Sequence, residues 1–176
     1  MNQVCLKHKQ VQHRYEEPEY KEGSLELFIE NNAKEKARSL EKDYPVSMII
    51  AADQLACVDD TVLYKSGTKE RAIMQLEMLN GRSHQLICSV AILYKGIMKS
   101  AVEKATLLMR NLSPEEIVAY VEFDKPWHCA GSYKYESLGA ALFEKIEVND
   151  PTTIIGLPIN RLLTILRDWD YSPLLK

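Results

Sequence analysis

The stretch from Ile49 to Gln54 carries the strongest chemical signal in this chain. Its apolar residues predict a buried strand that ends in a carboxylate, Asp53, followed by an amide, Gln54. Catalytic groups often lie where a core strand meets a loop, because the sheet fixes their position and the loop leaves them accessible. An ordinary aspartate that turns the chain at a strand end gives the same pattern. Taken alone, the pattern favours this second interpretation.

The elements around Asp53 can be predicted from periodicity. Apolar residues from Ser24 to Leu40 recur at helical spacing and indicate an amphipathic helix, which Tyr44-Pro45 ends. Met48 to Ala52 is predicted as the buried strand, and Leu55–Val58 with Thr61–Leu63 as a hairpin around Asp59-Asp60. We therefore expect Asp53 to lie between two extended segments.

The rest of the chain alternates between strand and helix signals. A capping residue, a proline or a glycine marks most of the boundaries. The expected elements are a helix after Thr68 that ends at Asn80-Gly81, a long hairpin of His84–Tyr94 and Ile97–Met109 joined by Lys95-Gly96, a helix after Ser113 to about Val121, a strand from Ala141 to Val148, and a helix from Pro158. This order predicts an α/β protein whose single domain holds a mixed, partly antiparallel, twisted sheet flanked by helices.

Composition excludes several classes of function. The chain has 176 residues, 46% of them hydrophobic, and a formal net charge of -3, so nothing in its overall charge favours a nucleic acid or an anionic membrane as partner. Four widely spaced cysteines and four histidines show no zinc-ligand spacing, which indicates reduced thiols in a cytoplasmic protein. No apolar run approaches the roughly 20 residues that a membrane-spanning helix needs.

Several short segments form a pattern when they are taken together and in order. They are Glu17; Ala33-Lys34-Glu35-Lys36-Ala37; Ala52-Asp53-Gln54; Lys65; Leu112-Ser113-Pro114-Glu115-Glu116-Ile117; His128-Cys129-Ala130-Gly131-Ser132-Tyr133 with Glu136; and Gly156-Leu157-Pro158. This pattern resembles the Maf family of nucleoside triphosphate pyrophosphatases, which has an ITPase-like fold. The Asp-Gln pair and the segment that ends at Glu136 are most similar to the YceF branch.

This resemblance implies a metal-dependent hydrolase that converts 7-methyl-GTP, or a related modified nucleotide, to the monophosphate and pyrophosphate and so keeps modified nucleotides out of nucleic acids. It implies that Asp53 is the catalytic base and that Glu17 and Asp53 hold Mg²⁺ or Mn²⁺. It also implies that Lys36 and Lys65 contact phosphates. Lys36 is equally typical of a solvated helix face, and Tyr64-Lys65-Ser66 replaces the family's Gly-Lys-Pro.

The resemblance further implies that Gln54 and Glu136 read the base. A carboxylate suits N7-methylguanine, which is cationic and offers N1–H and N2–H donors. A glutamate facing solvent in a loop is the alternative for Glu136.

One part of the family pattern is absent. Met1 to Arg14 contains neither the opening apolar strand nor the Ser- and Arg-rich loop expected to hold the triphosphate. We therefore expect a domain over residues 1–176 that is truncated at its N-terminus, through a truncated start, a mistaken start codon or a decayed copy. The alternative function is then a catalytically impaired nucleotide-binding or regulatory Maf-like protein connected with cell division. Loss of the strand would leave a sheet edge open, which suggests a homodimer.

Overall fold

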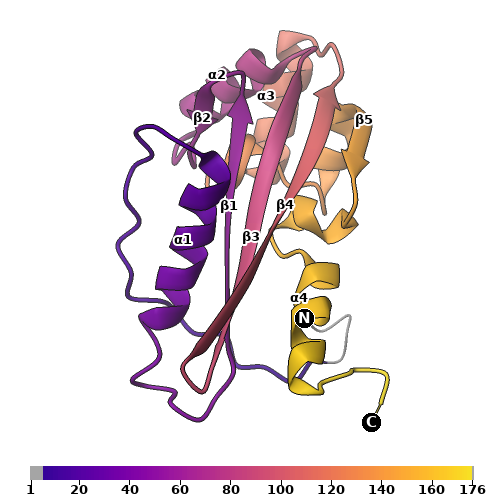
Figure 1. The fold of residues 1–176 in the computed structure, drawn as a ribbon. Coiled ribbons are helices and arrows are strands. Elements are labelled where there is room, and N and C mark those ends of the chain that lie inside the picture. The colour runs from indigo at the N-terminus through magenta and orange to yellow at the C-terminus, as the bar shows by residue number, and fades with distance from the viewer. Residues whose placement is uncertain (1–5, 176) are drawn as a thin grey trace.

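The computed structural model describes residues 6–175, in which helices and strands alternate along most of the chain (Figure 1). The α-helices are α1 (Leu25–Arg38), α2 (Lys69–Leu79), α3 (Pro114–Asp124) and α4 (Ile159–Leu166). The strands are β1 (Ile49–Val58), β2 (Thr61–Leu63), β3 (Ser83–Tyr94), β4 (Ile97–Met109) and β5 (Phe143–Val148). Short 3-10 helices are η2 (Ala130–Ser132), η3 (Leu138–Leu142), η4 (Pro151–Ile155) and η5 (Arg167–Trp169).

The strands form one five-stranded sheet in the order β2-β1-β3-β4-β5. Each neighbouring pair is antiparallel, because hairpins join β1 to β2 and β3 to β4, and the other connections return the chain to the same end of the sheet. The α/β class and the helix-flanked sheet are therefore confirmed. The parallel pairing that a mixed sheet requires does not occur among the strands of residues 6–175.

β1 is longer than the sequence predicted. It pairs with β3 without interruption from Ile49↔Leu93 to Cys57↔Gln85, so Asp53 lies in the middle of a strand and opposite Ser89. The prediction that the strand ends at Asp53, between two extended segments, is wrong. The side chains of Asp53 and Gln54 find hydrogen-bond partners on opposite faces of the sheet, as described below, so both residues can remain within the strand.

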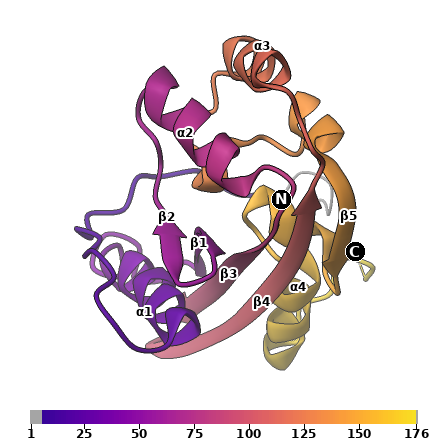
Figure 2. The same ribbon diagram turned by 90° about the horizontal axis from the view of Figure 1, so that it is seen from above.

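The sheet is covered on both faces, and the alternation of side chains along β1 separates them. α1 packs on one face, where Ile29 contacts Leu55 and Cys57. α4 packs on the other face, against Val90 and Ile92 of β3, and Figures 1 and 2 show α1 and α4 on opposite sides of β3 and β4. α2 and α3 share the α4 face and enclose the largest apolar cluster, which includes Ala56, Val58, Leu76, Leu79, Ile117 and Val121.

Local signals placed the helix starts well. Ser24, Thr68 and Ser113 each accept a backbone N–H three residues on, and Ser113 with Glu116 forms the predicted capping box. Boundaries elsewhere shift by a few residues. α3 continues to Asp124, β5 begins only at Phe143 because Leu138–Leu142 forms η3, and Pro158 lies at the N-cap of α4 instead of inside it.

The segment before α1 is extended and contains no helix or strand from residue 6 to residue 24. Leu6 is buried with the α4 cluster, and the segment then passes below the sheet and rises beside α1 (Figure 1). This agrees with the predicted lack of an opening strand for residues 6–14, whereas residues 1–5 lie outside the described residues. No helix within residues 6–175 combines the length and apolar character needed to cross a membrane.

One edge of β1 is only partly paired. β2 contacts β1 from Ala56 to Val58 alone. Within residues 6–175, the stretch from Ile49 to Leu55 therefore has β3 on one side and no strand on the other. Asp53 and Gln54 both lie along this edge.

Candidate functional site

Asp53 is held by two residues of α1. Lys36 Nζ lies 2.5 Å from Asp53 Oδ1, and Asn32 Nδ2 donates a hydrogen bond of 3.0 Å to Asp53 Oδ2. Helical residues four apart share a face, so Asn32 and Lys36 approach the same position of β1. Asp53 and Lys36 are only 9% and 7% exposed, so this is a buried ion pair and not a surface one.

Glu17 brings a second carboxylate to the same ammonium. Its Oε1 lies 3.0 Å from Lys36 Nζ and 3.6 Å from His13 Nε2. The Glu17 side chain is 37% exposed, so the cluster opens to solvent on the side of the extended segment. The structure therefore brings together three predicted site residues, Glu17, Lys36 and Asp53.

Two further residues join this cluster that sequence reasoning missed. Asn32 Oδ1 accepts a hydrogen bond of 3.2 Å from the Tyr15 hydroxyl. Burial raises the pKa of Tyr15, and the negative charges of Glu35, Asp53 and Glu17 raise it further, while Lys36 lowers it. The available signal was an asparagine within the buried apolar stripe of α1, since an amide there needs polar partners.

Gln54 points to the opposite face of the sheet, because it follows Asp53 directly in the strand. Its Nε2 donates to the backbone carbonyls of Thr153 and Ile154 in η4, at 2.8 and 3.4 Å. Gly156 follows η4, and a Cβ at that position would lie 3.7 Å from Gln54 Oε1. The Gln54 amide donor is thus occupied by η4, while its oxygen faces the space beside Gly156.

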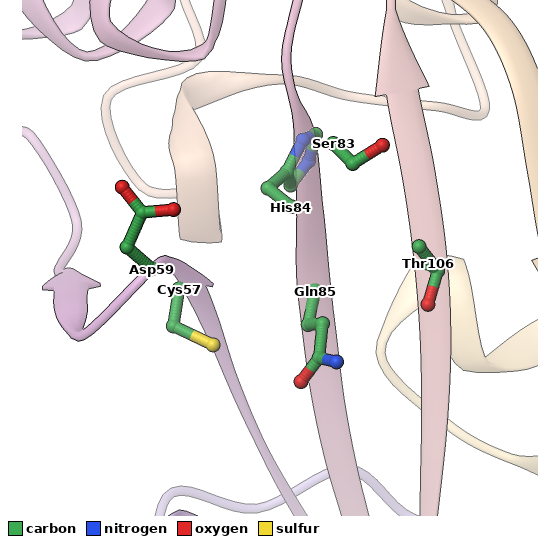
Figure 3. Close-up of a pocket in the computed structure, with 6 residues that line it drawn as sticks. All are labelled: Cys57, Asp59, Ser83, His84, Gln85 and Thr106. Carbon is green, nitrogen blue, oxygen red and sulfur yellow. The ribbon is translucent and has the colours of Figure 1, made fainter.

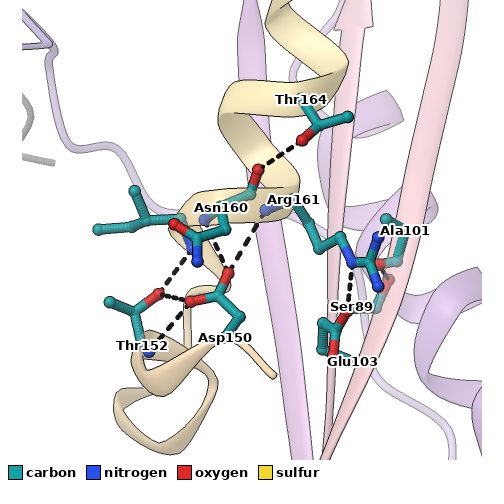
Figure 4. A network of polar contacts seen from close by, with 9 residues as sticks. Ser89, Ala101, Glu103, Asp150, Thr152, Asn160, Arg161 and Thr164 are labelled. Atoms are coloured by element: carbon teal, nitrogen blue, oxygen red, sulfur yellow. Dashed lines mark hydrogen bonds and ion pairs between the residues drawn. The ribbon is translucent and has the colours of Figure 1, made fainter. Parts of the chain in front are cut away.

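Asp150 fixes the segment that holds Gln54. Its Oδ1 accepts from the N–H and hydroxyl of Thr152, and its Oδ2 accepts from the N–H groups of Asn160 and Arg161 (Figure 4). One buried carboxylate therefore caps both η4 and α4. The Arg161 side chain also pairs with buried Glu103 of β4, which ties α4 to the sheet.

Lys65 and Glu136 lie in loops on the α2 and α3 side, and both are exposed. A hydrogen bond of 3.0 Å from the Gly67 N–H to the Trp127 carbonyl joins the two loop regions. Burial raises the pKa of Cys129, which Glu136 also raises and Lys65 lowers, so both charges lie near this thiol. The structure places Lys65 and Glu136 in one region and contains no contact between them and Asp53.

His84 and the pocket beside it include none of the predicted site residues described above. Cys57, Asp59, Ser83, His84, Gln85 and Thr106 line the pocket (Figure 3). His84 Nε2 is bonded to the Tyr133 hydroxyl at 2.9 Å, and burial lowers the pKa of His84 to about 4. These contacts fit a structural role for His84. None of the lining residues named is a lysine or arginine, so none of them offers a permanent positive charge to a phosphate.

The cluster at Asp53 contains two residues that could hold a metal ion, Glu17 and Asp53. Glu17 and Asp53 supply hard oxygen donors that already converge on one ammonium. Among the described residues no group of three or more His, Cys, Asp or Glu side chains gathers, so a closed cage of protein ligands is not formed there. Mg²⁺ is commonly held by one or two carboxylates, with substrate phosphates and water completing its shell, and this donor set fits that description.

Comparison with known proteins identifies the family of this chain. Residues 1–169 match the family described as Maf-like protein. A 7-methyl-GTP pyrophosphatase of Hahella chejuensis is 43% identical over 139 residues, which span 78% of this chain and 70% of the relative. Proteins of the same name are 34% identical in Colwellia psychrerythraea, over 86% of this chain and 77% of the relative, and in Idiomarina loihiensis, over 100% and 91%. The chain therefore belongs to the Maf family.

Proposed function

We propose that this protein hydrolyses 7-methyl-GTP, or a closely related modified nucleotide, to the nucleoside monophosphate and pyrophosphate. The relatives named above carry the name 7-methyl-GTP pyrophosphatase at 34–43% identity. The observation that carries the proposal is the buried carboxylate of Asp53, held by Lys36 and Asn32 beside a second carboxylate. Removing modified nucleotides in this way would keep them out of nucleic acids.

Asp53 is proposed as the general base. Hydrolysis between the α- and β-phosphates needs a water that is oriented and deprotonated as it attacks phosphorus. Each oxygen of Asp53 already accepts one hydrogen bond, from Lys36 and from Asn32, which leaves each of them a further lone pair. That lone pair can accept the proton of a water on the solvent side.

Glu17 and Asp53 are proposed to hold Mg²⁺ or Mn²⁺. A divalent ion bound there would neutralise negative charge on the phosphate oxygens. Its binding requires Lys36 to leave its position between the two carboxylates, because the ammonium now occupies that space. Once displaced, Lys36 is free to contact a phosphate oxygen as a point charge, and Lys65 is proposed to do the same from the loop before α2.

Gln54 and Glu136 are proposed to recognise the base. The Gln54 oxygen is directed away from the η4 carbonyls that its own nitrogen contacts, so it is available to accept a hydrogen bond. The Glu136 carboxylate can accept N1–H and N2–H of the purine and can favour the positive charge of the methylated ring. The Gln54 side chain lies on the face of the sheet opposite to that of Asp53, and Glu136 lies in a loop, so base and phosphate recognition would use different parts of the protein.

We further propose a homodimer and a cytoplasmic location. The unpaired edge of β1 from Ile49 to Leu55 supports the dimer, because exposed strand edges readily pair with another chain. A monomer by light scattering at assay concentration would contradict it. Cys57, Cys88 and Cys129 are free thiols, which supports a reducing compartment.

The decisive experiment measures pyrophosphate release from 7-methyl-GTP, GTP, dTTP and UTP, with and without Mg²⁺ or Mn²⁺. We expect metal-dependent release with a preference for 7-methyl-GTP, and loss of it in Asp53→Asn. Asp60→Asn is the matched control, because Asp60 is exposed in the turn between β1 and β2. Normal turnover in Asp53→Asn would refute the role of Asp53 as general base. Binding of nucleotide by the parent chain without release of pyrophosphate would refute the proposal that it is an enzyme.

A further inference from the structure

Asn32 is a buried amide in a part of α1 that otherwise packs against the sheet. It is 3% exposed, and its neighbours on the same helix face, Ile29 and Ala33, are 1% and 0% exposed. Burying an amide without partners costs about 1–3 kcal/mol in proteins, so a buried asparagine is stable only where both ends of its amide are satisfied.

Both ends of the Asn32 amide have partners. Nδ2 donates to Asp53 Oδ2 at 3.0 Å, and Oδ1 accepts from the Tyr15 hydroxyl at 3.2 Å. An ionised carboxylate can only accept, so the amide nitrogen must face Asp53 and the oxygen must face Tyr15. The orientation of Asn32 is therefore determined by chemistry as well as by packing.

The hydrogen bond from Asn32 to Oδ2 fixes the plane of the Asp53 carboxylate. The terminal torsion of an aspartate is broad, so the plane of its carboxylate is fixed only by outside contacts. Lys36 holds Oδ1 only while no metal ion displaces it, whereas Asn32 can hold Oδ2 throughout and so limit rotation of the carboxylate plane. A base or a metal ligand depends on the orientation of that plane, because small errors in geometry are costly to rate.

We infer that Asn32 is a positioning residue for Asp53 and that Tyr15 in turn holds Asn32. This inference rests on the proposed function, since it assigns Asn32 to the reaction through Asp53 and not through contact with substrate. Partners that orient a carboxylate or a metal ligand typically contribute about 10- to 100-fold in activity or metal affinity. We expect an effect of that size at Asn32.

The test compares Asn32→Leu and Asn32→Asp with Asn31→Leu and Asn31→Asp. Asn31 is exposed, adjacent in α1 and identical in type, so its variants control for helix propensity and added charge. With 7-methyl-GTP we expect kcat to fall about 10- to 100-fold in both Asn32 variants, with KM within about twofold, because an interaction that acts on the transition state lowers kcat and kcat/KM together. Asn32→Asp keeps the shape of the side chain but places a second carboxylate against Asp53, so Asn32→Leu, which adds no charge, decides whether kcat depends on the hydrogen bond.

The possible outcomes separate the inference from the proposed function. Equal kcat in the Asn32 and Asn31 variants of an active protein would overturn the inference alone. No pyrophosphate release from the parent chain would overturn the proposed function and the inference with it. If the Asn32 variants do not fold, Tyr15→Phe tests the same contacts, because it removes only a hydroxyl from a half-buried ring. A lowered kcat with an unchanged KM supports the inference, and an unchanged kcat overturns it.

Discussion

Replacing Lys36 by methionine should destabilise the protein, because it leaves the buried carboxylate of Asp53 without its ion-pair partner. The ammonium lies 2.5 Å from Asp53 Oδ1, and both side chains are 9% exposed. Removing one partner of a buried pair costs roughly 3–5 kcal/mol, because the other charge is left without compensation. Glu17 is 37% exposed and can turn to water, so it adds little. We expect Lys36→Met to lower the free energy of unfolding by about 3 kcal/mol.

The control for this substitution is Lys34→Met on the same helix. Lys34 Nζ pairs with Glu30 Oε1 at 2.8 Å across one helical turn, and such pairs contribute about 0.5 kcal/mol or less. In a domain of this size about 3 kcal/mol corresponds to a drop in Tm of roughly 6–12 °C, against roughly 1–2 °C for the control. Calorimetry and urea unfolding would measure both changes.

A double-mutant cycle makes the test stricter. Asp53→Asn removes the charge that Lys36 compensates, so the double variant should be more stable than the sum of the single effects by about 2–3 kcal/mol. Mn²⁺ should also raise the Tm of Lys36→Met more than that of the parent, because a divalent ion can replace the ammonium between Glu17 and Asp53. Equal melting of the Lys36 and Lys34 variants, or simple additivity in the cycle, would refute the buried pair.

Three further predictions concern other parts of the molecule. The depressed pKa of His84, about 4, means that the unfolded chain binds an extra proton below pH 6.5, so stability should fall as the pH drops from 6.5 and be lower by roughly 3 kcal/mol at pH 4. His84→Phe should remove that part of the slope in urea unfolding at several pH values, and an unchanged slope would contradict the assignment. Asp150→Ala should cost about 3 kcal/mol because it uncaps η4 and α4 together, whereas Asp150→Asn, which keeps acceptor oxygen, should cost less; equal losses would count against the caps. Glu136→Gln should raise KM for 7-methyl-GTP more than KM for GTP, because both bases offer N1–H and N2–H donors but only the methylated ring is cationic, and an equal change for both nucleotides would show that Glu136 does not sense the methylated base.

The parts of the fold that sequence predicted well depend on neighbours in the chain. Ser24, Thr68 and Ser113 mark helix starts because their hydroxyls bond to N–H groups three residues away. Lys95-Gly96 marks the long hairpin because both residues adopt positive φ, 50° and 75°, as a tight two-residue turn requires. Such signals lie within a few residues and are therefore readable without knowledge of the fold.

The candidate site was harder to predict because its partners are distant. Asp53 was expected to end a strand, since a short polar pair after an apolar run is typical of a turn. Lys36 lies 17 residues away in the chain from Asp53, and Thr153 lies 99 residues away from Gln54, yet these contacts allow both polar side chains to stay within β1. Likewise, nothing near Tyr15 in sequence indicates that its hydroxyl supports Asn32.

The positions of Asp53 and Gln54 impose a condition on any substrate that contacts both. Consecutive strand residues point to opposite faces, so one nucleotide can reach Asp53 with its phosphates and Gln54 with its base only by passing around an edge of β1. The edge toward β3 is closed by pairing, whereas the other edge has no strand beside it from Ile49 to Leu55 among the described residues, so the nucleotide and a second chain would compete for this edge. This arrangement predicts separable effects of the two side chains.

Those effects can be measured with 7-methyl-GTP and GTP as paired substrates. Asp53→Asn should lower kcat for both nucleotides by the same factor, because it acts at the phosphate that they share. Gln54→Leu should change the ratio of their kcat/KM values, since it removes the oxygen next to Gly156 and leaves the α1 face untouched. If Gln54→Leu instead lowered kcat for both equally, Gln54 would act only by holding η4 through Thr153, and recognition of the base would have to be sought at Glu136 and its loop.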